Sequence, residues 1–376
     1  MPIVKTVQVP GGKSLDLEAK VIAAIETVGP RNIAEIARIT GAHQETIRYK
    51  IKKRFVKRGF RFQAEVDYGK LGLTLHWGRF VVSPIYYESA PKFFAALGAH
   101  GYLTHYAKIL PSGHFVALFA LPTGKGEKFR SFLRGLQKRK VIADFDLDKV
   151  EAERHKPMDV SQFDFKAGRW EANWSKIRES RGSPLVIDRT PKSQLADETD
   201  LKIVKELQIN ALQHATEIAR KLKMNEKTVE YHYRAHVVKE SLIPRYRVRW
   251  MRDLTRRVTH SLTIVRMTFN GLDDRAYERV QSAINRIPFL WVEARLEHGT
   301  YVATLAIPVS EVMETMSYLN EEIQYLGPKA DIGFLRDRDS YNFTIPYEMF
   351  VEGEWEFDPR KMETAAVAQL SKSLKK

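Results

Sequence analysis

The sequence carries one pattern twice, in the same order, over most of its 376 residues. Residues Ala34–Arg38 match Thr216–Arg220, and Thr46–Tyr49 match Thr228–Tyr231, each pair at a separation of 182 positions. Further along, Gly113–Pro122 matches 299–308 at a separation of 186 positions. Several matches in one order and at nearly one spacing indicate a duplicated gene. Whatever the first half folds into is therefore expected twice.

The first part of each half has the apolar spacing of a helix-turn-helix followed by a β-wing. In the first half Gly41 is expected to end the second helix, and Ile47, Ile51 and Phe55 form the buried stripe of the third. The expected helices span 17–27, 33–39 and 43–57, with a wing at 60–66, and in the second half 201–207, 216–222 and 226–238, with a wing at 246–250.

The second part of each half has the element order βαββαβ. In the first half the elements are expected at 75–82, 88–98, 102–110, 114–121, 126–138 and 141–147, and in the second at 261–269, 274–286, 289–297, 301–307, 310–326 and 331–335. This order predicts an antiparallel sheet with both helices on one face, so pairing two such sheets would cover the free faces. The fold class is therefore α+β, with two copies of a winged helix-turn-helix plus a βαββαβ (ferredoxin-like, RAM-type) domain.

Six domain segments follow from this pattern. A linker rich in Gly, Ser and Pro at 178–197 separates the halves, and Trp170 and Trp355 mark extensions that we expect to pack as anchors. The segments are 13–73 (winged helix-turn-helix 1), 74–152 (βαββαβ domain 1), 153–196 (Trp-bearing extension and linker), 197–257 (winged helix-turn-helix 2), 258–345 (βαββαβ domain 2) and 346–376 (Trp-bearing extension and basic tail).

The charge of the chain favours a polyanionic partner. Its formal net charge is +15, and between Gly41 and Arg61 eight Lys or Arg stand against one acid. Cations clustered this way gain free energy by releasing counterions from nucleic acid, and a recognition helix presents its outer face to base edges. The predicted contacts with double-stranded DNA are Gln44, Glu45, Arg48, Tyr49, Lys52, Lys53 and Arg61 in the first half and Lys227, Tyr231, Arg234, Arg245, Arg247 and Arg249 in the second.

Several site classes are not expected. The chain has no cysteine, which excludes disulfides and thiolate chemistry. Residues 1–14 lack a signal-peptide core and no run of ~18 apolar residues occurs, so a cytoplasmic protein without a membrane partner is expected. His100, His105 and His114 are close in sequence but are not expected to converge on a metal. The sequence thus predicts no metal, no catalytic residue and no cofactor, and it names no cofactor-binding residue.

The whole order resembles the Lrp/AsnC (feast/famine) regulators of bacteria and archaea, in a tandemly duplicated form of archaeal type. The resemblance rests on Ile33–Ala37, Thr46–Arg48, 59–62 and 69–73, and on the βαββαβ module behind them. It implies dimerisation through that RAM module, which leaves a homodimer or higher oligomer open, and a small-molecule effector, commonly an amino acid. It also implies a role in transcription regulation.

The leading hypothesis is therefore a sequence-specific transcription regulator, not an enzyme, whose single chain imitates a family dimer. One alternative is an architectural protein that binds nucleic acid with little sequence preference. Another is an enzyme, because siroheme decarboxylases resemble Lrp/AsnC proteins and pair two related units. Thr104–Tyr106 is loosely similar to their His-bearing strand, and the second half has Val292–Ala294 at that place.

Overall fold

The computed structural model describes the chain with short gaps. The described residues are 16–157, 159–164, 169–188, 193–249, 262–323 and 330–374, the side chains of 336–338 and 371–374 excepted. Residues 13–15 of the expected first winged-helix unit and 250–257 of the second lie outside them. The fold class predicted from the sequence is confirmed, since both halves contain the helix-turn-helix and the βαββαβ module.

The first winged-helix module forms around the predicted stripe. Its elements are α1 (Leu17–Val28), α2 (Ile33–Thr40), α3 (Gln44–Tyr49), η1 (Lys50–Phe55) and β1 (Arg61–Glu65). Gly41 caps α2 in the left-handed conformation, at a φ of 68°, which glycine adopts without strain. Ile47, Ile51 and Phe55 are each 0% exposed, as their helical spacing predicts.

The second winged-helix module repeats the first. Its elements are α7 (Glu198–Ile209), α8 (Ala215–Leu222), α9 (Glu226–His232), η5 (Tyr233–Val238) and β8 (Arg245–Arg249). A capping box between Asp197 and Asp200 begins α7, and the Asn225 side chain caps α9. Val229 and Val237 are buried on the inner face of the recognition helix, which consists of α9 and η5.

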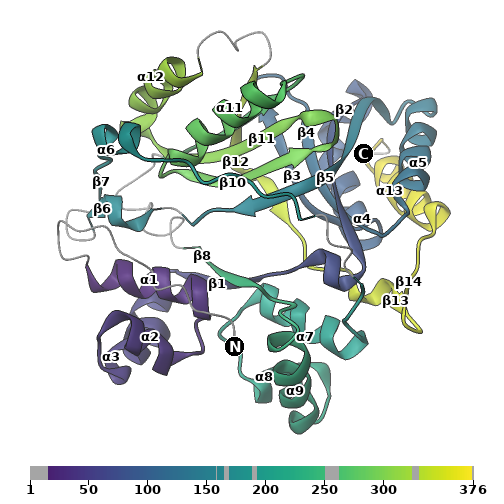
Figure 1. Ribbon diagram of the computed structural model, residues 1–376. Helices are drawn as coiled ribbons and strands as arrows, with labels where there is room; N and C mark the ends of the chain where they lie inside the picture. Colours follow the sequence, from purple (N-terminus) through teal and green to yellow (C-terminus); the bar gives the residue numbers. More distant parts are fainter. Residues whose placement is uncertain are drawn as a thin grey trace.

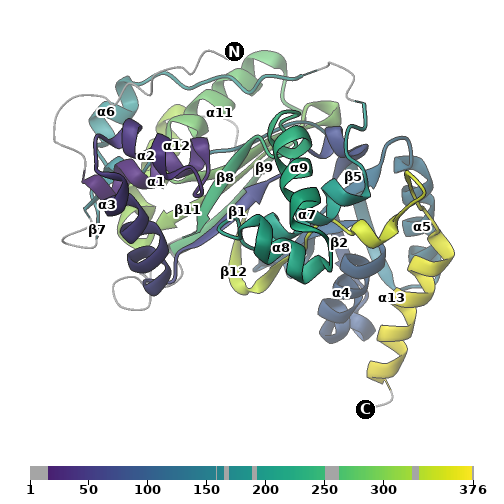
Figure 2. The same ribbon diagram turned by 90° about the horizontal axis from the view of Figure 1, so that it is seen from below.

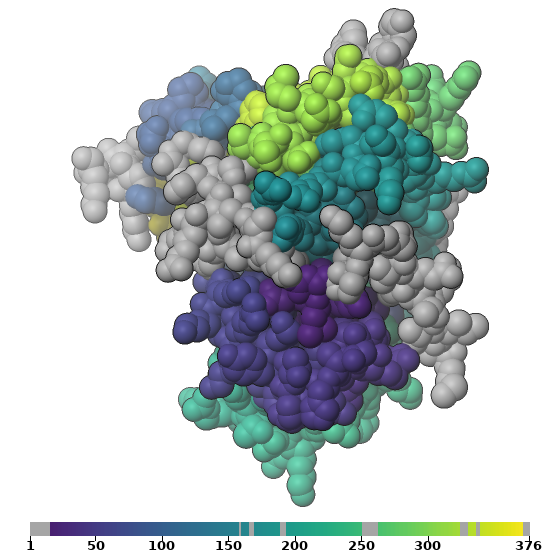
Figure 3. All heavy atoms as spheres, turned by 90° about the vertical axis from the view of Figure 1, so that its left-hand side faces the viewer, coloured from purple at the N-terminus to yellow at the C-terminus, as the bar shows by residue number. Residues whose placement is uncertain are grey.

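The two wing strands pair with each other instead of forming separate wings. Strands β1 and β8 are antiparallel, with Gln63 opposite Arg247 and Phe62 opposite Val248. The ribbon they form lies between the two helix-turn-helix units (Figure 2). Both modules form a tier beneath the remainder of the molecule, and Figure 3 shows the first of them as the lower part of one side.

The two βαββαβ modules close into one barrel (Figure 1). The order of its eight strands is β10-β11-β9-β12-β3-β4-β2-β5, so β5 joins β10 and β12 joins β3. The strands are β2 (Leu73–Val82), β3 (Leu103–Leu110), β4 (Phe115–Pro122), β5 (Ile142–His155), β9 (Leu262–Phe269), β10 (Leu290–Leu296), β11 (Tyr301–Pro308) and β12 (Ala330–Asn342). The covering helices are α4 (Ala90–His100), α5 (Gly126–Lys138), α11 (Asp274–Arg286) and α12 (Val312–Glu322).

Each half packs its winged-helix module beneath the other half's βαββαβ module. One apolar core joins Phe80 and Phe119 to Leu201 and Val204, and a second joins Ile22 to Phe289 and its neighbours. The extensions seal these cores: Trp170 packs edge-on against Phe289, and Trp355 Nε1 donates to the Leu71 carbonyl at 2.6 Å. Both tryptophans are buried, which confirms their prediction as packing anchors.

The extensions consist of short elements and one longer helix. These are β6 (Phe163–Asp164), β7 (Arg169–Trp170), α6 (Trp174–Glu179), β13 (Phe350–Val351), β14 (Glu354–Trp355) and α13 (Pro359–Leu374). Helix α13 packs against α4 and α5, beside the first βαββαβ module. No helix within the described ranges is both long and apolar enough to cross a bilayer.

Candidate active site inside the barrel

Strand alternation determines which side chains enter the barrel. On β3 the ring of Tyr106 stacks on Phe94 of α4, so the neighbouring His105 projects from the opposite, inner face. On β9, Val265 and Met267 belong to the helix-facing core, which places Arg266 inside. The inner face carries an unusual concentration of polar side chains, namely His105, Glu153, His155, Arg266, Thr304 and Asn342.

His105 is held as a neutral imidazole. Its Nδ1 lies 3.1 Å from Asn342 Oδ1 on the neighbouring strand β12. Because the amide oxygen only accepts, Nδ1 carries the proton and Nε2 is left with its lone pair. Burial and then the charge of Arg266 lower the pKa of His105 to about 4, despite the opposing hydrogen bond to Asn342. The imidazole can therefore accept a proton when a ligand of negative charge arrives.

Arg266 is a buried cation without a bound carboxylate. It is 7% exposed, donates from Nη1 to Thr304 Oγ1 at 2.7 Å, and lies 3.7 Å above the ring of Trp77. Its Nε has no hydrogen-bond partner, and no carboxylate among the described residues forms an ion pair with it. Burial lowers the pKa of Arg266 to about 9, with Glu153 opposing the change. A guanidinium in this state offers an unused donor to an anion.

Arg266 and Trp77 occupy equivalent places in the two halves. Arg266 is opposite Thr304 on the next strand, and Trp77 is opposite Leu118, which corresponds to Thr304 in the repeat. Their strands lie on opposite sides of the barrel, so the contact between them crosses its interior. Trp77 also packs against two small apolar clusters, one with Ala107, Ile109 and Val116 and one with Ala294, Leu296 and Val302.

A second polar group connects the barrel to the β1–β8 ribbon. Arg247 donates to Glu65 Oε1 at 2.9 and 3.0 Å and also to His155 Nδ1. His155 Nδ1 is therefore an acceptor, and its Nε2, 3.5 Å from Glu153, carries the proton. Burial opposes ionisation of Glu153, but the interaction with His155, which includes a hydrogen bond, and the charges of Arg247 and Arg266 outweigh it and lower the pKa of Glu153. Arg245 adds a bond to the His155 carbonyl at 2.8 Å.

The strand pairing corrects the equivalence expected between His105 and the second half. Val292 is opposite Thr304 just as His105 is opposite Leu118, so Val292 occupies the place of His105. The neighbouring residue, Glu293, faces the helices and is 0% exposed. Its carboxylate accepts from Tyr301, Gln281, Asn285 and Arg154 at 2.8–2.9 Å, which makes it a fully bonded structural group.

Most of the predicted DNA contacts lie on the outer faces of the recognition helices. Gln44, Glu45, Arg48, Tyr49, Lys52, Lys53, Arg61, Lys227, Tyr231 and Arg234 are exposed. Arg48 pairs with Glu45, Arg234 with Glu230, and Lys52 Nζ lies 3.1 Å from His214 Nε2. Arg245, Arg247 and Arg249 are only half-exposed, and the first two face Glu65 and His155. Binding of DNA by these residues stays a prediction.

Three inner residues were missed by sequence reasoning, namely Arg266, His155 and Asn342. A lone arginine in the otherwise apolar strand Leu262–Phe269 was an available signal. His114 Nδ1 lies 2.7 Å from Ser112 Oγ, whereas His105 Nδ1 lies 3.1 Å from Asn342 Oδ1. A different group, made of Asp197, Asp200, His232 and His236, does converge and was not anticipated.

No family model matches the sequence, and no curated protein does. Among solved structures, the siroheme decarboxylase NirDL matches over 96% of this chain and 100% of its own, at 12% identity and a TM-score of 0.54. The same enzyme in complex with an iron-uroporphyrin III analogue covers 94% and 99%, at 14% identity and a TM-score of 0.55. Escherichia coli AsnC covers 36% of this chain, at 14% identity and a TM-score of 0.27.

These matches correct the function expected from the sequence. The predictions of an Lrp/AsnC transcription regulator and of a protein that is not an enzyme are wrong, because the full-length structural likeness is to a decarboxylase. The matches to Lrp/AsnC regulators extend over only part of the chain. The duplication and the Lrp/AsnC-like fold remain, and the likeness to NirDL concerns the fold alone.

Proposed function

We propose that this protein is a decarboxylase that acts on a tetrapyrrole with carboxylate side chains, such as siroheme. The observation that carries the proposal is that neutral His105 and a buried Arg266, which forms no ion pair with the described residues, both lie inside a barrel to which both halves contribute. A buried cation of this kind costs free energy unless an anion completes it. A carboxylate of the substrate is the simplest anion that would do so.

The full-length likeness to NirDL adds support from the fold. That enzyme is a siroheme decarboxylase, and one of its structures holds an iron-uroporphyrin III analogue. The protein described here would bind the same class of molecule at the polar end of its barrel, beside the β1–β8 ribbon. Arg266 would bind one carboxylate, and Arg247 and His155 lie at the same end to meet another.

The chemistry requires a proton but no oxidant. In loss of CO2 from an acetate side chain, the bond between the methylene and carboxyl carbons breaks and CO2 leaves. The electron pair stays on the methylene carbon, where a proton converts it into a methyl group. Bound carboxylates would raise the pKa of His105 from its low value, so that its Nε2 could carry that proton. The Asn342 bond would keep the ring in one orientation.

Titration with iron uroporphyrin III tests the binding part of this proposal. The absorbance band of the tetrapyrrole should shift on addition of protein and saturate at one molecule per chain. Arg266→Met should weaken binding by at least about 10-fold, since a charged hydrogen bond contributes about 1.5–3 kcal/mol. His114→Asn, at the exposed turn between β3 and β4, is the matched control and should bind normally. Absence of any spectral change would contradict the proposal.

Because the outer faces of the recognition helices are basic, binding of double-stranded DNA remains a separate prediction. The amino acid effector and the homodimer implied by the Lrp/AsnC resemblance, and a cytoplasmic location, likewise stay predictions. A gel-shift experiment with Arg48→Ala, which removes one exposed cation, addresses the first of them.

A further inference from the structure

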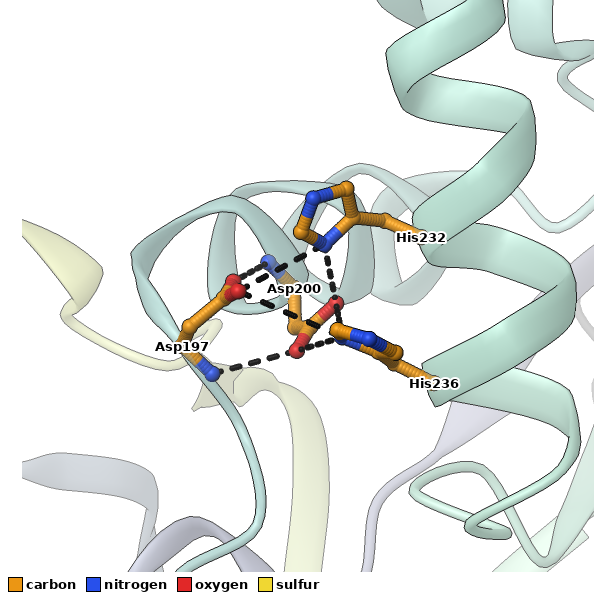
Figure 4. Close-up of side chains that lie close together, drawn as sticks. All are labelled: Asp197, Asp200, His232 and His236. Carbon is orange, nitrogen blue, oxygen red and sulfur yellow. Dashed lines mark hydrogen bonds and ion pairs between the residues drawn. The ribbon is translucent and has the colours of Figure 1, made fainter.

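Four potential metal ligands converge in the second winged-helix module (Figure 4). Asp197 precedes α7 and Asp200 lies in its first turn, whereas His232 and His236 are four residues apart on the recognition helix. One ligand atom from each residue lies within 4.8 Å of all the others. Both histidines direct Nδ1 at the fully buried carboxylate of Asp200, at 2.9 Å from His232 and 3.0 Å from His236.

The first half shows what this position ordinarily contains. Glu18 is the counterpart of Asp200, and the places of His232 and His236 are taken by Lys50 and Arg54. Glu18 is 2% exposed and forms ion pairs with Lys50 at 3.4 Å and Arg54 at 2.7 Å. Arg58 adds a third ion pair at 3.0 Å. A buried carboxylate beneath the recognition helix is thus neutralised by three permanent cations in the first half.

The second half has lost all three cations. Two are replaced by histidines, and the counterpart of Arg58 is the acidic Glu240. A second carboxylate, Asp197, has been added within 3.6 Å of His232 and 4.0 Å of His236. Metal ligation requires neutral imidazoles and ionised carboxylates, and in that form two carboxylates and two histidines carry a charge of −2 for a partner to neutralise. We propose that this partner is a divalent transition-metal ion of the zinc class, bound by Asp197, Asp200, His232 and His236.

The distances suit such an ion. Zinc binds imidazole nitrogen and carboxylate oxygen at about 2.0–2.2 Å in tetrahedral sites, so neighbouring ligand atoms lie roughly 3.3–3.5 Å apart. The two histidine nitrogens lie 2.9 and 3.2 Å from Asp200 Oδ1 and 3.6 and 4.0 Å from Asp197 Oδ2, which brackets that value. Two nitrogen and two oxygen ligands also match the ligand types that zinc takes in proteins.

The ion would fasten the recognition helix to the start of α7. Asp197 and Asp200 already form the capping box of α7, with Asp197 N bonded to Asp200 Oδ2 at 3.1 Å and Asp200 N bonded to Asp197 Oδ1 at 2.9 Å. One oxygen of each carboxylate is therefore held in place by the backbone, and metal binding would use the ordered carboxylates without rebuilding the helix start. The site is independent of the barrel and of its proposed reaction.

Cobalt and zinc titrations of the tag-free, full-length protein test this proposal. After treatment with a chelator, one equivalent of Co²⁺ should give the visible ligand-field bands of tetrahedral coordination, and Zn²⁺ should abolish them. Calorimetry should report one zinc site, and zinc should raise the temperature at which the second winged-helix module unfolds. His100→Asn, an exposed histidine on α4, is the control and should bind the ion normally.

The decisive variant is the double change His232→Lys with His236→Arg, which restores the pairing of the first half. It should fold, because Lys50 and Arg54 stabilise the equivalent carboxylate, and it should lose the metal. Asp197→Asn removes one exposed carboxylate ligand and should weaken zinc binding by at least about 10-fold. Even changes to residues that only hold a metal ligand in place cost about that much in metal affinity. Absence of cobalt bands, or zinc binding that survives in the double variant, would overturn the proposal. In those cases the histidines simply donate hydrogen bonds to Asp200.

Discussion

Replacing Arg266 by methionine is expected to stabilise the ligand-free protein while it impairs binding of the tetrapyrrole. The guanidinium is 7% exposed and keeps one donor, Nε, without a partner. Among the described residues, the Thr304 hydroxyl and the Trp77 ring hold it. If the cation serves the substrate, its presence is a cost in the absence of substrate, and an apolar chain of similar length removes that cost.

The magnitude follows from the charge. Burial lowers the pKa of Arg266 from the ordinary arginine range to about 9, which disfavours the charged form by roughly 5 kcal/mol. Against this gain, loss of the contact with Trp77 costs the variant about 2 kcal/mol, and imperfect packing of the methionine costs about 1 kcal/mol. The variant should therefore be more stable by about 2 kcal/mol, within the ~1–4 kcal/mol seen when buried charges are replaced by apolar groups.

Urea unfolding at neutral pH, followed by circular dichroism and fluorescence together, measures this difference. Arg79→Met is the matched control, because Arg79 lies on the same strand as Trp77 but is 35% exposed and pairs with Asp144 and Asp146. That change should cost no more than about 1 kcal/mol. A loss of several kcal/mol in Arg266→Met would refute the reasoning, since it would assign the buried cation to the fold and not to a ligand.

Three further predictions concern titrating and buried charges. The folded pKa of His105 is about 4, below the ordinary 6.5, so the stability that its neutral form contributes should be fully present above pH 6.5. The free energy of unfolding should then fall by roughly 3 kcal/mol as the pH drops towards 4, and urea unfolding of His105→Asn should lack that fall. Burial raises the pKa of Glu26 to about 8, so the stability that its protonated form contributes should be present below pH 4.5 and lost as the pH rises through 8. At pH 9 Glu26→Gln should therefore be more stable than the wild type in urea unfolding, and equal stabilities would count against the raised pKa. Glu18→Gln should destabilise the protein by about 2 kcal/mol in thermal or urea unfolding, because Lys50 stays buried without its carboxylate partner. Glu45→Gln, which removes an exposed ion pair, should change the free energy of unfolding by less than ~0.5 kcal/mol, and equal effects of the two changes would contradict the burial argument.

Local pattern predicted the elements because their causes are local. The stripe Ile47, Ile51 and Phe55 became the core of the first winged-helix module. The alternation of β3 and β4 around Pro111–Gly113 likewise gave two paired strands. In each case the residues that determine the element are close to one another in the sequence.

The partners of the strands could not be predicted in this way. Closure of the barrel depends on β5 meeting β10 and β12 meeting β3, contacts between segments more than a hundred residues apart. The strand pairing also puts Val292, and not Glu293, at the place of His105, because the same register shift occurs in both halves, between Leu103 and His105 and between Leu290 and Val292. One residue of slippage moves a side chain from the inner face to the outer face of a sheet.

Charge in the sequence also misled the functional prediction. Arg245 and Arg247 count as basic residues of a wing, yet their partner Glu65 lies 182 positions before Arg247 and on the paired strand. Formal charge reports the sign of a side chain and not whether a carboxylate meets it in the fold. The same applies to Arg266, because its unpartnered Nε and its lack of an ion pair with the described residues emerge only once the barrel is closed.

Anaerobic incubation of the purified protein with siroheme, followed by mass spectrometry of the tetrapyrrole, tests the central claim most directly. The account predicts products lighter by the mass of one or more CO2 molecules, formed by the wild type and by His114→Asn. His105→Asn should form them at a rate lower by at least about 100-fold, as expected for loss of a proton carrier. Arg266→Met should form them more slowly at limiting siroheme, because it binds the substrate at least about 10-fold more weakly. Siroheme recovered unchanged after it has bound to the wild-type protein would contradict the account.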